Sequence, residues 1–286
     1  MAGPREPTRL KTATDLLRWL EREISPRLSD VTEAIAHGGT ALTLLGIKDS
    51  TKDVDFAFRT QDQFDAFRRV VELLGFRGTL DSKATPSEVL HRYENRASVI
   101  DLVDLRFPTW NNWRLTKTIL RNAVVIPLGN IRLIRPDRDA VFLFKTYPLR
   151  DTDLDDLSTV LSKSPPDEDR VIALFDEQDV IHRSELLTET VHEPLINILE
   201  LRVRFAASFE LLGRAWRRKV PRIARHARRR FGELRIRPTL TALTKRLRAT
   251  EALVKWEDVL DESGDRLRRE LAVKPGRPRA SAARTP

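Results

Sequence analysis

The sequence predicts an α+β fold in the first half of the chain and an all-helical, basic region after it. Up to about residue 165, apolar residues recur at helical spacing in some segments and alternate in others, which is typical of mixed helices and strands. After Pro165-Pro166 the alternating patterns end and long helical patterns follow. We therefore expect a first domain over residues 1–165, a helical domain over 166–272, and a disordered tail over 273–286, where Pro, Gly, Ala and Arg dominate.

Each element of the first half has its own signal. Apolar residues at helical spacing predict a helix over residues 12–24 that Pro26 ends, and another over 64–74 that Gly75 ends. The other expected elements are, in order, a strand or short helix over 31–36, a helix over 40–45, a strand over 53–58, a flexible loop over 78–88, a strand over 97–107 and a hairpin over 124–134.

The composition is that of a globular protein with a basic excess. With 286 residues, 41% of them hydrophobic, the chain is long and apolar enough to form a packed core. It contains no cysteine, which excludes disulfides, thiolate zinc sites and cysteine nucleophiles. It shows no apolar run that could cross a bilayer and no signal-peptide core, so we expect a cytoplasmic protein with no membrane partner. The net charge of +9 favours polyanionic partners, nucleic acid before membrane surfaces.

A glycine pair precedes the helix expected over residues 40–45. Glycines before a helix leave backbone N–H groups open to an anion, so Gly38, Gly39 and Thr40 are candidates to bind the phosphates of a nucleoside triphosphate (NTP). Asp53 and Asp55 follow on the alternating strand, where residues two apart project from the same face. Two adjacent carboxylates suit Mg²⁺ or Mn²⁺, hard cations with oxygen ligands. This combination is the equipment of nucleotidyl transfer, although a solvated strand end would carry the same aspartates.

Two-metal phosphoryl chemistry usually needs a further carboxylate. Asp101 and Asp104 both lie in the strand expected over residues 97–107, and because they are three apart only one of them can face the first two carboxylates. We favour Asp101, which lies deeper in the apolar run, where an unpaired charge would be costly. The alternative is that either aspartate simply pairs with Arg96 or Arg106.

The glycine pair and the aspartates occur in a recognisable order. Gly38-Gly39-Thr40-Ala41-Leu42 and Ser50-Thr51-Lys52-Asp53-Val54-Asp55-Phe56 resemble the core motif of the polymerase-β nucleotidyltransferase superfamily. They are most similar to the small prokaryotic branch that includes the abortive-infection (AbiEii-type) toxins. The resemblance covers residues 32–161 and implies a polymerase-β-type core, a small mixed sheet with flanking helices, with Asp101 as the third carboxylate. It also implies tRNA as acceptor and, for a toxin, an antitoxin partner.

The resemblance extends to a helix with a single lysine, followed by an arginine and two aspartates three apart. On this basis Lys145 would contact the nucleotide phosphates as a point charge. Asp153 and Asp156, on one helical face, would orient Lys145 or the acceptor, which assigns Asp153 to the nucleotide site. Ordinary helix capping by Thr152 and Asp153 would explain the same residues without a substrate.

A run of arginines in the second half indicates a nucleic-acid surface. On one helix four of them would form a continuous stripe able to follow a phosphate backbone, namely Arg218, Arg222, Arg225 and Arg229. The alternatives are a merely solvated helix face, or an interruption of the helix at Pro221 that shortens the stripe.

Together these patterns predict a Mg²⁺- or Mn²⁺-dependent nucleotidyltransferase in which Asp53, Asp55 and Asp101 hold the metal. It would transfer a nucleotide from an NTP to an acceptor hydroxyl, on RNA in the first instance, and release pyrophosphate. If the three carboxylates converge, their repulsion should raise the pKa of at least one of them. The competing hypothesis is an inactive protein of the same fold that only binds nucleic acid.

Overall fold

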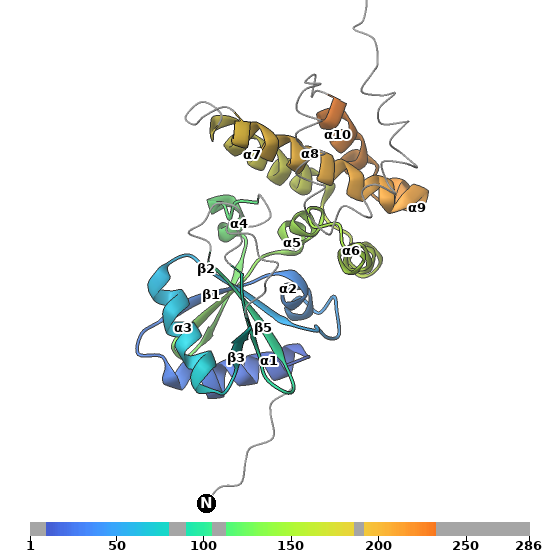
Figure 1. Ribbon diagram of the computed structural model, residues 1–286. Coiled ribbons are helices and arrows are strands. Elements are labelled where there is room, and N and C mark those ends of the chain that lie inside the picture. The colour runs from blue at the N-terminus through green and yellow to red at the C-terminus, as the bar shows by residue number, and fades with distance from the viewer. Residues whose placement is uncertain (1–9, 80–89, 105–112, 186–191, 233–286) are drawn as a thin grey trace, which may run out of the picture.

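The computed structural model describes residues 10–79, 90–104, 113–185 and 192–232. In these ranges the chain forms a mixed sheet at one end and a group of packed helices at the other (Figure 1). The strands are β1 (Thr32–Ala36), β2 (Val54–Phe58), β3 (Arg77–Thr79), β4 (Leu90–Glu94), β5 (Val99–Asp104), β6 (Val124–Leu128) and β7 (Ile131–Arg135). The helices are α1 (Ala13–Trp19), α2 (Gly38–Leu44), α3 (Gln61–Leu73), α4 (Lys117–Arg121), α5 (Arg138–Lys145), α6 (Asp151–Lys163), α7 (Glu168–Glu185), α8 (His192–Leu211), α9 (Gly213–Lys219) and α10 (Pro221–Gly232).

The seven described strands are hydrogen-bonded in the order β3-β4-β5-β2-β1-β7-β6. The pairs β1–β7 and β2–β5 are parallel and the remaining pairs are antiparallel, so the predicted mixed sheet is confirmed. The expectation that the sheet is small is wrong. Its extra breadth comes from β3 and β4 at one edge, whose sequences, Arg-Gly-Thr and Leu-His-Arg-Tyr-Glu, are mostly polar and do not alternate.

The first helix illustrates how local sequence sets an element. The Thr12 hydroxyl accepts a hydrogen bond from the N–H of Asp15, and the Asp15 carboxylate accepts one from the N–H of Thr12. This capping box fixes the start of α1. The helix continues through a π-helical turn, Leu20–Ile24, and ends in a 3₁₀ turn, Ser25–Arg27, that contains Pro26. The predicted helix over residues 12–24 and its end at Pro26 are confirmed.

Strand β2 separates the hydrophobic core from the face that carries the aspartates. Phe56 and Phe58 are fully buried and pack against Phe67 of α3, with ring centroids 5.4 and 5.1 Å apart. Because alternate residues of a strand point to opposite faces, Asp55, which lies between the buried Val54 and Phe56, projects from the other side of the sheet. The strength of this apolar packing fixes the register, and with it the direction of the carboxylates.

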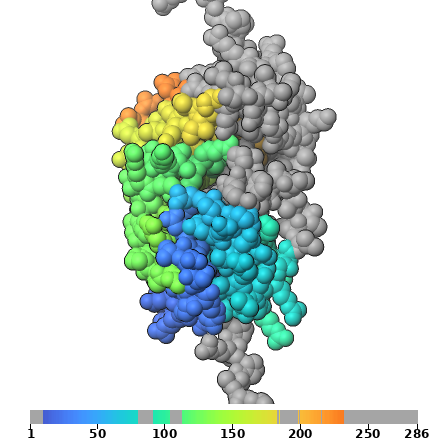
Figure 2. Space-filling model, turned by 90° about the vertical axis from the view of Figure 1, so that its left-hand side faces the viewer, coloured from blue at the N-terminus to red at the C-terminus, as the bar shows by residue number. Residues whose placement is uncertain are grey.

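The second half of the described chain is helical, as predicted. Phe175 of α7 stacks on Phe205 of α8 with centroids 4.0 Å apart, and Asp179 and Arg202 form a buried ion pair between the same helices. Phe209 of α8 also packs against Phe142 of α5, 6.3 Å away, so one cluster of buried apolar side chains runs through both halves. On the face shown in Figure 2 the helical part lies directly above the residues of the first half.

Several expectations fall partly outside the described residues. These are most of the flexible loop over 78–88, the last part of the strand over 97–107, the rest of the helical domain to 272, and the tail over 273–286. The first two residues of the loop segment are described and belong to β3. The boundary between domains at residue 165 stays a prediction. Among the helices that are described, none combines the length and apolar character needed to cross a membrane.

Candidate active site

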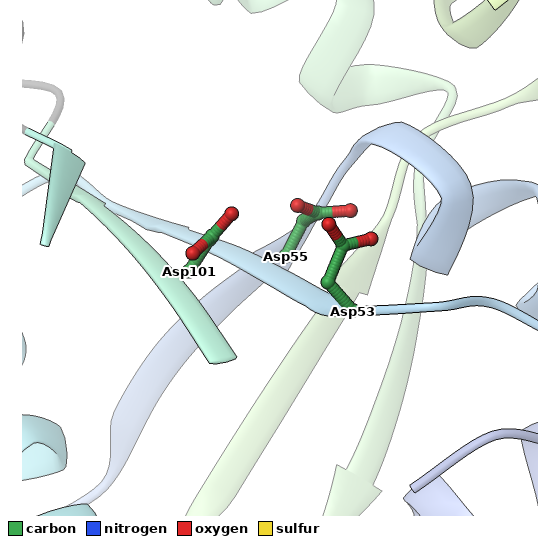
Figure 3. A group of neighbouring side chains, drawn as sticks. All are labelled: Asp53, Asp55 and Asp101. Atoms are coloured by element: carbon green, nitrogen blue, oxygen red, sulfur yellow. The ribbon is translucent and has the colours of Figure 1, made fainter. Parts of the chain in front are cut away.

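Three carboxylates converge on the face of the sheet opposite the phenylalanine core. Asp53 immediately precedes β2, Asp55 lies within it, and Asp101 lies beside Asp55 on the parallel strand β5. Asp53 and Asp55 share a face because they are two residues apart, and the pairing of Asp55 with Asp101 brings the third side chain to the same face. One oxygen atom from each carboxylate lies within 4.8 Å of the others (Figure 3). The convergence predicted from the sequence is therefore confirmed.

The carboxylates repel one another, and this repulsion changes the pKa of Asp55. Partial burial raises the pKa of Asp55 to about 7, with further contributions from Asp53 and then Asp101, while Lys145 and Arg150 oppose the shift. The predicted rise in one pKa is thus confirmed at Asp55. A divalent cation would relieve this repulsion, and three converging carboxylate oxygens form the donor set that Mg²⁺ or Mn²⁺ accepts. The chain's own residues therefore fit a metal of this kind.

Asp101 has a cationic partner that sequence reasoning missed. Arg92, its neighbour in β4, donates from Nε and Nη2 to the two carboxylate oxygens at 2.8 and 2.7 Å. This bidentate pair takes the place of the alternative pairing with Arg96, while Arg106 lies outside the described residues. The structure thus brings Asp101 into the group, while the side chain of Asp104 lies outside what the structure describes. Only recognition of the five-residue strand β4 could have revealed Arg92.

The glycine pair is needed because two side chains press against it. Gly38 has φ +55°, and a Cβ there would lie 2.6 Å from Oδ2 of Asp55. A Cβ on Gly39 would lie 2.6 Å from Oγ1 of Thr51. A Cβ at either position would force the facing side chain to move, so the turn lies directly against the carboxylate group.

Thr40 has a different role from the one that its position suggests. Its hydroxyl is fully buried, donates to the carbonyl oxygen of Asp53 at 3.3 Å and accepts the N–H of Asp55 at 2.8 Å. The Thr51 hydroxyl also donates to the Asp53 carbonyl, at 2.8 Å. Thr40 therefore ties α2 to the strand that carries the aspartates, and any contact from it to a phosphate would have to come from its backbone.

Lys145 lies in a buried group of ion pairs between α5 and α6. Its Nζ donates to Asp153 Oδ1 and Asp156 Oδ2, both at 2.8 Å, as expected for two aspartates on one helical face. Arg150 donates from Nε to the second oxygen of Asp153 at 2.7 Å. Burial favours the neutral form of Lys145, but the two carboxylates outweigh it and raise its pKa. Burial likewise opposes ionisation of Asp153, yet Lys145 and Arg150 lower its pKa.

Lys48 completes this cation group and was not identified from the sequence. It lies between α2 and β2, and its Nζ donates to Asp156 Oδ1 at 2.6 Å. The same nitrogen is 3.9 Å from the position of a Cβ on Gly39, so the amine also borders the glycine turn. The only sequence signal was its place in the short connection between the glycine pair and the aspartates. We call Lys48, Lys145 and Arg150, with Asp153 and Asp156, the cation group.

His37, just before the glycine pair, is a buried neutral residue. Burial, followed by the nearby charges of Lys145 and Arg150, lowers its pKa to about 3, although a backbone hydrogen bond with Phe56 opposes the shift. Its backbone N–H donates to the carbonyl oxygen of Asp55 at 3.3 Å. His37 therefore helps to join the glycine turn to β2 and does not act as a cation at neutral pH.

The arginine stripe is divided between two helices. Arg218 lies on α9, which ends at Lys219, and α10 starts at Pro221, so the alternative of an interruption at this proline is correct. Arg222, Arg225 and Arg229 lie on one side of α10 and are all exposed. Arg222 pairs with Asp169 of α7. A shorter basic face is thus present on α10.

Comparisons with known proteins leave the family of this chain open. No model of a protein family matches the sequence, and no curated protein matches it either.

Proposed function

We propose that this chain is a divalent-metal-dependent nucleotidyltransferase. The observation that carries the proposal is the convergence of Asp53, Asp55 and Asp101 against a glycine turn whose other side meets the cation group. Carboxylates that hold Mg²⁺ or Mn²⁺ beside cations that attract a polyphosphate suit an NTP better than either set alone would. The polymerase-β resemblance agrees with this assignment.

In the proposed reaction an acceptor hydroxyl attacks the α-phosphorus of the NTP. A new P–O bond forms to the acceptor, the bond to the β-phosphate breaks, pyrophosphate leaves, and the hydroxyl proton passes to a carboxylate of the site. The bound metal would stabilise the charge on the attacking and leaving oxygens. Asp53, Asp55 and Asp101 would hold it, and the hydrogen bonds of Thr40 to the backbone of β2 would keep the first two in place.

The triphosphate would lie along the glycine turn toward the cation group. Gly38 and Gly39 allow close approach, and Thr40 contributes its backbone. Lys145 adds a buried positive charge whose position Asp153 fixes, which retains both residues in the nucleotide site. Each cation near the phosphates would act on charge that moves onto the leaving pyrophosphate.

RNA, and tRNA in particular, is the proposed acceptor. The support is the exposed basic face of α10, formed by Arg222, Arg225 and Arg229, together with the resemblance to the AbiEii-type branch. Modification of an essential tRNA end would make the protein a toxin acting in the cytoplasm, and a neighbouring antitoxin would then be its partner.

The second candidate is a nucleic-acid-binding protein without catalysis, favoured by the same basic face. The two are separated by variants that remove one feature each. Asp53→Ala should abolish function in an enzyme but not in a binding protein, whereas replacing the three α10 arginines with glutamine should weaken both. The convergence of three carboxylates, whose mutual repulsion is costly, supports the enzyme.

Label transfer tests the proposal. The protein is incubated with each α-³²P-labelled NTP, total cellular RNA and either Mg²⁺ or Mn²⁺, and the products are separated from free nucleotide. We expect label on RNA with the wild type and none with Asp53→Ala. Asp49→Ala is the matched control, since Asp49 lies in the same connection but its side chain is 95% exposed. A wild type that labels neither RNA, protein nor small hydroxylated acceptors would contradict the proposal.

A further inference from the structure

We propose that Lys48 binds the γ-phosphate of the nucleotide and makes the site prefer a triphosphate to a diphosphate. In this arrangement Lys145 is a positioning residue that holds Asp156, the carboxylate partner of Lys48. The inference rests on the proposed function and adds to it the residue that recognises the end of the polyphosphate.

Lys48 is the lysine of the cation group that reaches solvent. Its side chain is 29% exposed, compared with 9% for Lys145. Its amine borders Gly39, and its hydrogen bond to Asp156 fixes the amine there. An ammonium group has three donors, so a lysine that gives one to a carboxylate retains the capacity to bind an incoming oxyanion.

Lys145 is arranged differently. Two of its donors go to carboxylates at 2.8 Å, and one of these, Asp153, is completely buried. A lysine held in this way is a rigid support, and its charge is balanced within the protein. Asp156 joins the two lysines, since it accepts from Lys48 through Oδ1 and from Lys145 through Oδ2. Lys145 and Asp156 thereby fix the place of the Lys48 amine.

The order of contacts along the site determines which phosphate Lys48 meets. Asp101 lies opposite Asp55 in the register of the parallel strands β5 and β2, and Asp55 lies against Gly38. The following glycine, Gly39, lies beside Lys48. Charge along this path therefore changes from negative to positive. A nucleotide whose α-phosphate lies at the metal-binding carboxylates would extend along the glycine turn, and its last phosphate would meet Lys48.

Equilibrium binding tests this assignment without turnover. The probes are α,β-methylene nucleoside triphosphates of the four bases and the matching α,β-methylene diphosphates, titrated into the full chain with Mg²⁺ by calorimetry. We expect wild type to bind a triphosphate more tightly than its diphosphate. Because a charge-assisted hydrogen bond is lost, Lys48→Met should weaken triphosphate binding by roughly 10-fold to 100-fold and leave diphosphate binding within about twofold. Lys48→Arg should keep most of the preference.

Lys163→Met is the matched control. Lys163 lies on α6 and its amine is 3.6 Å from Asp49, the residue after Lys48, but its side chain is 52% exposed and belongs to neither group. It should bind both probes as wild type does, and thermal melts should show all variants folded. A Lys48→Met protein that retains the triphosphate preference, or loses both ligands equally, refutes the inference while the proposed function stands. A wild type that binds no nucleotide overturns both.

Discussion

Replacing Asp55 with asparagine should stabilise the metal-free protein in a pH-dependent way. The pKa of Asp55 rises from 3.8 to about 7 in the folded state because of burial and of its neighbours Asp53 and Asp101. The folded state therefore holds this proton more tightly than the unfolded state, so the contribution of Asp55 to stability falls as pH rises through this interval. Below the unfolded pKa the penalty is absent, and above the folded pKa it is complete.

The size of the effect follows from the shift. At 1.36 kcal/mol for each pKa unit, the raised pKa of Asp55 lowers the free energy of unfolding by about 4 kcal/mol at pH 8, and by about 2 kcal/mol at pH 5, where Asp55 is ionised only in the unfolded state. Asparagine has nearly the same shape but does not ionise, so the variant does not lose this stability. The Asp55→Asn variant should therefore be more stable than wild type, and the gap should be about twice as large at pH 8 as at pH 5.

The assay is urea unfolding in the presence of EDTA at the two pH values. Asp49→Asn serves as the control, because its side chain is 95% exposed and its charge should have little effect on stability. If Asp55→Asn is no more stable than wild type at pH 8, or if the gap does not change with pH, the repulsion argued for the carboxylates is absent. When Mg²⁺ replaces EDTA, we expect wild type to become the more stable of the two proteins, since only wild type retains all three ligands.

Three further predictions test other parts of the site. Lys145→Met leaves buried Asp153 with Arg150 but without its lysine, so urea unfolding should show a loss of about 3 kcal/mol, against little change for Lys163→Met. Gly38→Ala would place a Cβ 2.6 Å from Asp55 Oδ2 and should abolish label transfer, whereas Gly46→Ala, also at positive φ but with open space around it, should lower only the melting temperature. Replacing Arg222, Arg225 and Arg229 with glutamine should reduce the salt dependence of RNA binding by about two units of slope, measured by filter binding at several salt concentrations; an unchanged slope would remove α10 from the interface.

The carboxylate group could be predicted because it depends on local rules. Residues two apart on a strand share a face, and the burial of Val54 and Phe56, the two neighbours of Asp55, fixes the direction of its side chain. Asp101 followed from its depth in an apolar run. The lysine and its two aspartates were predicted from the resemblance, and their ion pairs are confirmed.

The partners that come from elsewhere in the fold could not be predicted. Arg92 meets Asp101 only because β4 pairs with β5, a tertiary contact with no periodic signal. Lys48 meets Asp156 across 108 residues, and no pattern around either one indicates the other. The arginine stripe was predicted as continuous because its spacing is helical, but Pro221 starts a new helix there.

The central claim is that the carboxylate group transfers the nucleotide part of an NTP. The most direct test compares two reactions with RNA that differ only in the label, one with α-³²P-NTP and one with γ-³²P-NTP, in the presence of Mg²⁺. Nucleotidyl transfer places the α-label on the acceptor and releases the γ-label as pyrophosphate, and both events should disappear in Asp53→Ala but not in Asp49→Ala. Transfer of the γ-label to the acceptor, or release of pyrophosphate by Asp53→Ala at the wild-type rate, would contradict the account.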